Sequence, residues 1–176
     1  IIGKSSDYFD INFRGKNYLL LIAIDEYEHI THLNNAVKDA KDFKNLLIRK
    51  YQFEEDRIIE IINAEAHYDA IDTIFREMAE KIPPDDNLII FFSGHGHYDE
   101  FLEEGYWVPA DARMGKVKDY IPYTNITRSI KKIPSRHTFL IADSCYSGAV
   151  LVKEVRDDKT FDPRENDPSR WILASG

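Results

Sequence analysis

The sequence contains little cysteine, no long apolar run and no concentration of positive charge. Its single cysteine, Cys145, excludes an internal disulfide. The longest uninterrupted apolar run, residues 18–24, is far shorter than the roughly 20 residues a membrane-spanning helix needs. The 23 Lys and Arg residues are scattered and outnumbered by 31 Asp and Glu residues, giving a net charge of −8. We therefore expect neither a membrane nor nucleic acid as a direct partner.

The scarcity of cysteine also bears on the compartment. A chain that cannot form an internal disulfide, and that opens without a basic-then-apolar leader, fits a reducing environment. We expect a cytoplasmic protein. A lone cysteine in such a compartment is a candidate nucleophile.

The length of 176 residues and the apolar share of 43% suit one globular domain. The chain opens at Ile1 without a Met and ends in Trp171-Ile-Leu-Ala-Ser-Gly176, which resembles a strand that is just beginning. We therefore expect a fragment of a longer protein.

Apolar runs of strand length alternate with stretches of helical period. Continuous runs of this kind predict strands covered on both faces, and apolar residues at every third or fourth position predict amphipathic helices. The expected strands are residues 18–24, 57–63, 87–93 and 137–143, with a short strand or turn at 105–109. Three helices are expected. The first begins after a cap at Asn34 or Asn35, the second runs from about 71 to 82 and ends before Pro83, and the third covers about 124–132.

This alternation predicts an α/β fold with a mainly parallel sheet and helices on both faces. In such sheets, ligands bind at the carboxyl ends of the strands. Two strand ends there carry reactive side chains beside small residues, namely Ser93-Gly-His-Gly96 and Asp143-Ser-Cys-Tyr-Ser-Gly148. An imidazole that takes the proton of a thiol makes it a strong nucleophile, so His95 and Cys145 can form a catalytic dyad.

These two motifs resemble those of the caspase-like cysteine peptidases, particularly metacaspases and related bacterial proteins. His95 precedes Cys145 by 50 residues, which is the order and spacing found in caspases. The segments 35–40, 106–111 and 170–176 also resemble parts of this family, so the likeness covers about residues 15–176. The resemblance implies a caspase-like three-layer sandwich and a cysteine endopeptidase.

The resemblance further implies a role for each matching residue. His95 would be the general base, Cys145 would form the acyl-enzyme, and the backbone N–H groups of Gly96 and Cys145 would form the oxyanion hole. Animal caspases have Gln two residues before the nucleophile, whereas this chain has Asp143. A carboxylate there favours Arg or Lys at P1, as in metacaspases, with Asp39 and Ser93 lining the same pocket. Asp25 also lies at this edge, without a clear role.

The family pattern also divides the chain. Residues of about 15–152 would form the large-subunit part, about 153–169 the inter-subunit loop, and 170–176 the first strand of the small subunit, whose remainder would be a missing partner segment. The stretch 153–170 contains five basic residues, which makes self-processing there a hypothesis; they are Lys153, Arg156, Lys159, Arg164 and Arg170. Bacterial relatives often act as inducible effectors in stress, cell-death or defence pathways, joined to sensor domains.

A metal could also contribute. Many metacaspases require calcium, and an acidic group follows the His95 motif, namely Asp99, Glu100, Glu103 and Glu104. A solvated acidic loop is the favoured explanation of these residues, so no metal ligands are assigned, and calcium as an activator stays an open alternative.

Three other functions compete with this one. His95, His97 and Asp99 fit the start of the zinc-binding pattern of metallo-β-lactamase-like hydrolases, but Glu100 stands where the next His is needed. A cysteine phosphatase would need Arg six residues after Cys145, where Leu151 stands. A non-catalytic caspase-like interaction module has no need to keep both His95 and Cys145.

Overall fold

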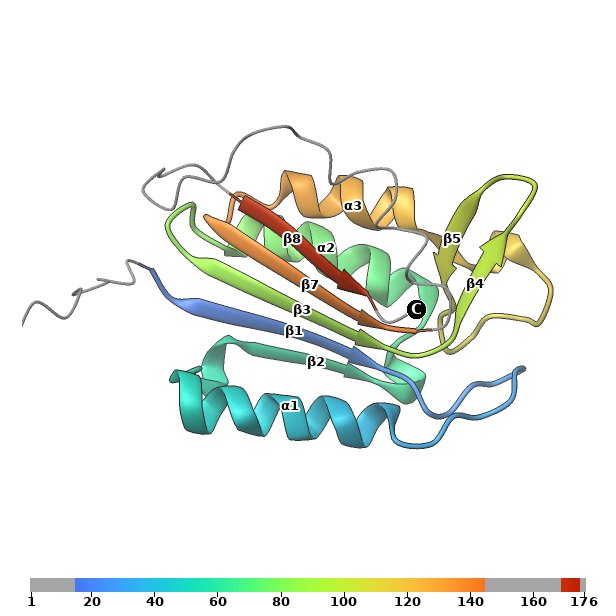
Figure 1. The fold of residues 1–176 in the computed structure, drawn as a ribbon, viewed down its shortest axis with the longest axis horizontal. Coiled ribbons are helices and arrows are strands. Elements are labelled where there is room, and N and C mark those ends of the chain that lie inside the picture. The colour runs from blue at the N-terminus through green and yellow to red at the C-terminus, as the bar shows by residue number, and fades with distance from the viewer. Residues whose placement is uncertain (1–14, 145–168, 175–176) are drawn as a thin grey trace, which may run out of the picture.

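The computed structural model of the protein describes residues 15–144 and 169–174. Within these ranges, five parallel strands form one sheet in the order β2-β1-β3-β7-β8 (Figure 1). The strands of this sheet are β1 (Asn17–Ala23), β2 (Ile58–Ile62), β3 (Asn87–Ser93), β7 (His137–Asp143) and β8 (Ser169–Ala174). The parallel sheet and the α/β class predicted from the sequence are confirmed.

Three helices cover the two faces of this sheet. They are α1 (Ala36–Tyr51), α2 (Tyr68–Lys81) and α3 (Tyr123–Lys132). Alternate residues of β1 pack on opposite sides, because successive side chains of a strand point to opposite faces. Leu19 and Leu21 join the cluster under α1, whereas Leu20 and Ile22 join the larger core that α2 and α3 cover. The result is the predicted three-layer arrangement (Figure 1).

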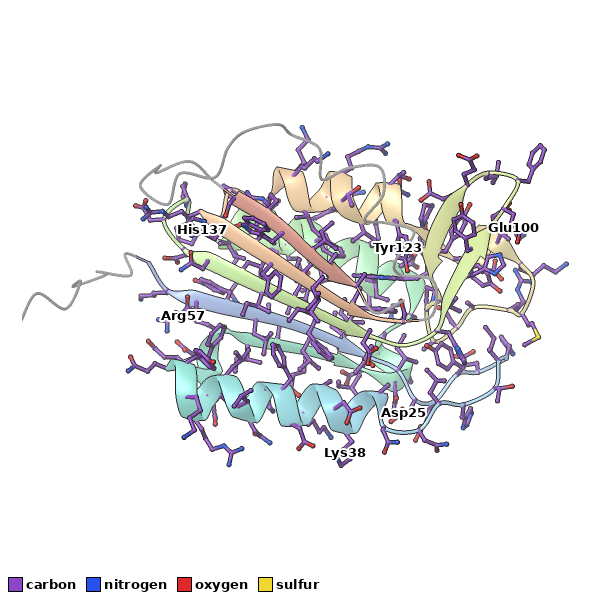
Figure 2. All side chains as sticks on the ribbon, in the orientation of Figure 1. Asp25, Lys38, Arg57, Glu100, Tyr123 and His137 are labelled. Atoms are coloured by element: carbon purple, nitrogen blue, oxygen red, sulfur yellow. The ribbon has the colours of Figure 1, made fainter. Side chains whose placement is uncertain are left out.

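A second, smaller sheet was not predicted. The acidic stretch after His95 forms an antiparallel hairpin of β4 (Gly96–Asp99) and β5 (Glu104–Trp107), which β6 (Ile121–Pro122) extends. Asp99 shapes the hairpin turn, since its carboxylate accepts the N–H groups of Phe101 and Leu102 at 2.9 and 3.0 Å. Glu100 lies at the far end of this hairpin, away from the main sheet (Figure 2).

None of the helices in the described ranges combines the length and the apolar character that crossing a membrane requires.

The cap of α1 differs from the prediction. Asn35 occupies the cap position with a left-handed backbone (φ 80°), but its side chain caps nothing. The carboxylate of Asp25 instead accepts the N–H groups of Ala36 and Val37 at 2.9 and 3.2 Å. Asp25 lies at the end of β1 beside the start of α1, and the sequence had shown no role for it (Figure 2).

Asp25→Ala is expected to lower the free energy of unfolding by about 1–2 kcal/mol, because two N–H groups at the positive end of the α1 dipole lose their acceptor. Urea denaturation of the variant measures the change. Asp42→Ala is the matched control, since Asp42 pairs with Lys38 on the exposed surface of α1 and such pairs contribute only about 0.3–0.5 kcal/mol. Equal losses in the two variants would contradict the capping role of Asp25.

Candidate active site

The two strands that lead to the predicted reactive positions end side by side. Strands β3 and β7 are neighbours, with Ser93 and Asp143 as paired residues at their carboxyl ends. His95 follows Ser93 by two residues, and Cys145 follows Asp143 by two. The Gly94 N–H donates to the Asp143 carbonyl oxygen at 3.4 Å, so the chains stay adjacent past the last strand pair. Cys145 itself lies outside the described residues.

The last described residue before Cys145 is fixed at the sheet edge. Ser144 is buried, with 5% of its surface exposed, and its hydroxyl lies 3.4 Å from the hydroxyl of Tyr123 on α3. The chain therefore enters the Cys145 motif from a defined position.

His95 lies between β3 and β4 and is partly exposed. Its Nε2 atom is 2.8 Å from the carbonyl oxygen of Thr31. A carbonyl can only accept a hydrogen bond, so Nε2 must carry the hydrogen. In the neutral imidazole, Nδ1 is then the nitrogen with a free electron pair and the one able to take a proton.

A tyrosine also holds this histidine. The backbone N–H of His95 donates to the phenol oxygen of Tyr27 at 2.7 Å, and the centres of the two rings are 4.8 Å apart. Burial raises the pKa of the Tyr27 phenol, so this group stays neutral. Tyr27 and Thr31 both lie in the loop that joins β1 to α1, residues 24–35, which we call the β1–α1 loop.

Sequence reasoning missed both Tyr27 and Thr31. Their position in the chain could have indicated them, since the β1–α1 loop follows a strand whose carboxyl end lies at the same edge of the sheet as the two motifs. Thr31 acts through its backbone carbonyl, which no residue type reveals.

The three residues predicted to bind the substrate share one face of the sheet. Phe91 and Ile141 face the cluster under α1. Ser93 and Asp143 follow them by two residues on the same strands, so they lie on the same side of the sheet. Asp39 lies in the first turn of α1, which begins at this edge (Figure 1). Asp143 is exposed, and the Asp39 side chain is 55% exposed, whereas Ser93 is buried.

The predicted acidic group does not gather around a shared point. Asp99 shapes the hairpin turn, and the carboxylate of Glu104 accepts the N–H of Thr124 at the start of α3 at 3.2 Å. His97 packs beside the rings of Tyr106 and Tyr120, with centroid separations of 6.0 and 5.4 Å. Within residues 15–144 and 169–174, no three His, Cys, Asp or Glu side chains are placed to hold a metal ion.

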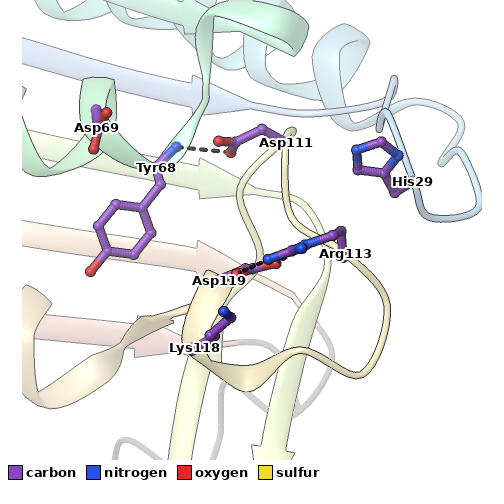
Figure 3. Close-up of a pocket in the computed structure, with 7 residues that line it drawn as sticks. All are labelled: His29, Tyr68, Asp69, Asp111, Arg113, Lys118 and Asp119. Atoms are coloured by element: carbon purple, nitrogen blue, oxygen red, sulfur yellow. Dashed lines mark hydrogen bonds and ion pairs between the residues drawn. The ribbon is translucent and has the colours of Figure 1, made fainter.

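An open pocket of about 470 Å³ lies elsewhere, lined by His29, Tyr68, Asp69, Asp111, Arg113, Lys118 and Asp119 (Figure 3). Several of its charged side chains bind other groups of the protein. Arg113 binds both carboxylate oxygens of Asp119 at 2.6 and 2.9 Å, and Asp111 accepts the Tyr68 N–H at 3.0 Å. The β1–α1 loop contributes His29 to this pocket, but neither His95 nor Asp143 lines it.

The chain matches known proteins over most of its length. The family described as "Caspase domain" matches residues 16–172. Metacaspase-1 of Meyerozyma guilliermondii is 27% identical over 154 residues, which is 80% of this chain and 37% of the relative. Metacaspase-1 of Pyricularia oryzae is 29% identical over 165 residues, or 85% of this chain and 41% of the relative. The chain thus spans well under half the length of these relatives.

Two solved structures share the fold. A protein of Geobacter sulfurreducens superposes with a TM-score of 0.60 at 16% identity, covering 74% of this chain and 50% of its own. The structure of pro-sf-caspase-1 superposes with a TM-score of 0.57 at 12% identity, covering 99% of this chain and 66% of its own. With the family match over residues 16–172, the parallel sheet and the two motifs at its edge, the chain belongs to the caspase domain family.

Proposed function

We propose that this protein is a cysteine endopeptidase of metacaspase type that cuts after Arg or Lys. One observation supports this most strongly. Ser93 and Asp143 are paired on neighbouring strands, and His95 and Cys145 each follow by two residues. The strand ends that precede the proposed general base and the proposed nucleophile are therefore neighbours at one edge of the sheet, which supports the proposal.

In the proposed reaction, Nδ1 of His95 takes the proton of the Cys145 thiol. The thiolate attacks the carbonyl carbon of the substrate peptide bond, and the backbone N–H groups of Gly96 and Cys145 stabilise the negative oxygen that forms. His95 then gives its proton to the departing amine, which leaves a thioester on Cys145. Water activated by His95 hydrolyses the thioester and restores the free thiol.

Thr31 supports this cycle through its carbonyl oxygen. The Nε2–H of His95 donates to it throughout, so proton transfer is confined to Nδ1. The negative end of the carbonyl dipole also stabilises the imidazolium that forms when His95 takes the thiol proton. Thr31 thus performs the orienting task of the third member of a catalytic triad.

The proposed preference for basic residues rests on Asp143. Its carboxylate is exposed at the end of β7, two residues before the proposed nucleophile. A guanidinium or ammonium group of the substrate can form charge-assisted hydrogen bonds with it. Asp39 adds negative charge on the same side of the sheet, and Ser93, which is buried and paired with Asp143, is proposed to lie at the base of the pocket.

The missing small-subunit segment is the proposed partner of the α1 side of β7 and β8. Three large apolar side chains lie on that side and are partly exposed: Phe139 (37%), Trp171 (51%) and Leu173 (55%). Helix α1 packs chiefly on β1 and β3, where its Phe43 stacks on Phe91. Covering these large apolar side chains is favourable, so the segment would complete both the core and the substrate pocket.

Self-processing is proposed for the stretch between the subunits, at Lys153, Arg156, Lys159 or Arg164. Arg170 no longer fits this role, because it lies within β8 and pairs with Thr138 of β7. Its guanidinium also donates to the carbonyl oxygen of Ile133 at 2.8 Å. An action as an inducible effector in stress, cell-death or defence pathways follows from family resemblance.

The full chain is expected to hydrolyse a fluorogenic peptide ending in Arg and to leave the matched Asp peptide intact. The measurement is made with and without calcium, and Cys145 is labelled in parallel with an arginyl electrophile. Cleavage of the Asp peptide alone would overturn the basic preference. Labelling of Cys145 without turnover would indicate an unmet activation step. The absence of both labelling and cleavage would favour a non-catalytic interaction module.

A further inference from the structure

We propose that Tyr27 is a positioning residue that fixes the backbone and ring of His95 for proton transfer. This inference rests on the proposed function, because it concerns the same histidine. Tyr27 touches neither the substrate nor the thiol in this proposal and acts only through His95.

The contacts of Tyr27 with the histidine segment are direct. Its phenol oxygen accepts the His95 backbone N–H at 2.7 Å, and its ring lies against the imidazole at an angle of 46°. A Cβ atom added to Gly94 would come within 2.8 Å of the same phenol oxygen. Tyr27 is 3% exposed, so it fills the space beneath residues 94 and 95.

The histidine segment depends on this support. His95 follows Gly94, a residue whose backbone has more freedom than any other type. The Thr31 carbonyl fixes Nε2, and the His95 carbonyl oxygen accepts the Val108 N–H at 3.0 Å, so the Tyr27 phenol holds the remaining backbone group of His95, its N–H. The contact of Tyr27 with the backbone and that of Thr31 with the ring thus act together on the position of Nδ1.

The β1–α1 loop is itself held at several points, which makes the phenol a fixed support. Asn63 accepts the N–H groups of Asp25 and Glu26 with its side-chain oxygen, at 2.9 and 3.2 Å. The Glu28 N–H donates to the carbonyl oxygen of Ala110 at 2.9 Å, so the residues on both sides of Tyr27 are anchored. A group positioned in advance loses little freedom when the reaction occurs, which favours catalysis.

If Tyr27 only stabilised the fold, its replacement would affect activity no more than replacement of a similar buried tyrosine. Tyr120 provides that comparison. Tyr120 is also buried, and its phenol oxygen also accepts a backbone N–H, that of Gly115 at 2.9 Å. Its ring lies beside His97 instead of His95. Tyr27→Phe and Tyr120→Phe therefore each remove a buried hydroxyl that accepts a backbone N–H; that of Tyr120 also donates to the Arg113 carbonyl oxygen at 3.3 Å.

The test compares the full chain with these two variants by two measurements. The first is hydrolysis of the Arg peptide, resolved into kcat and KM. The second is the ¹⁵N NMR spectrum of the His95 ring, which reports the nitrogen that carries the hydrogen and requires no activity. We expect Tyr27→Phe to lower kcat about tenfold with little change in KM, Tyr27→Leu to lower it further, and Tyr120→Phe to stay within about twofold.

We also expect the His95 spectrum of the unaltered protein to show hydrogen on Nε2 alone, and that of Tyr27→Phe to show a mixture of both forms. Equal kcat values for Tyr27→Phe and Tyr120→Phe, with an unchanged His95 spectrum, would overturn the proposal while leaving the peptidase function intact. A changed spectrum in a protein that neither cleaves the peptide nor is labelled at Cys145 would instead overturn the function and support the positioning role. A mixture of forms in the unaltered protein would also overturn the proposal.

Discussion

Replacing His95 with Gln, or Cys145 with Ala, is expected to lower kcat for the Arg peptide by about 10³-fold or more. Glutamine cannot take the proton of a thiol, and alanine has no nucleophile, so either change removes the covalent step. Because the two residues act as a pair, the double variant is expected to lose little more than either single variant. Sequencing of new N-termini in the same samples tests self-processing, which we expect only in the unaltered protein.

The matched control for this prediction is His97→Gln. His97 is two residues away, but it packs beside Tyr106 and Tyr120 while His95 binds the Thr31 carbonyl. We expect His97→Gln to keep most of the activity. Loss of activity in His97→Gln together with full activity in Cys145→Ala would contradict the dyad and favour the zinc hydrolase pattern.

Asp143→Asn is expected to lower kcat/KM for the Arg peptide by about 30-fold, because a charge-assisted hydrogen bond to the substrate cation contributes about 1.5–3 kcal/mol. The loss should appear chiefly in cleavage of Arg and Lys peptides. Labelling of Cys145 by a small neutral alkylating reagent should change little, since the thiol and His95 remain in place. Added salt should weaken the Arg preference of the unaltered protein and have less effect on the variant.

Asp72→Asn removes the same charge at a distant place and provides the control. Asp72 lies on α2, on the opposite side of the sheet from α1, where it pairs with Arg76 at 3.2 Å. If both variants lose the same activity, the effect is one of net charge and Asp143 does not bind the substrate. Asp39→Asn measured alongside them tests whether the first turn of α1 contributes to the pocket, and we expect a smaller loss because its side chain is more than half exposed.

The elements of the main sheet could be predicted because each has a strong local pattern. The apolar runs at β1 and β3 are largely buried on both faces, whereas the run at β7 is buried on one face only, which corrects the expectation of a strand covered on both. The apolar residues of α2 recur on one side, with Ile71, Ile74, Phe75 and Met78 all buried. The short strand or turn expected at 105–109 overlaps β5, but β4 and its pairing with β5 were missed. These strands are only four residues long, and their turn is stabilised by Asp99, which resembles a solvated acidic residue in sequence.

The position at which α1 starts was predicted correctly, but the side chain that caps it was not. Caps are usually found in the residues just before a helix, which pointed to Asn34 or Asn35. The actual cap comes from Asp25, 11 residues before Ala36. That contact exists only because the β1–α1 loop folds back on itself, as the hydrogen bond from the Leu33 N–H to the Asp25 carbonyl oxygen shows.

The sequence by itself determined the fold class, the edge of the sheet that carries the candidate site, and the candidate pair His95 and Cys145. Those conclusions follow from hydrophobic period and from residue types that carry chemistry. Only the tertiary structure decided that β3 and β7 are neighbours in register, that Thr31 selects the nitrogen of His95, and that Tyr27 supports its backbone. The physical reason is that these are contacts between residues more than 45 positions apart, through backbone atoms that every residue possesses, so no local pattern encodes them.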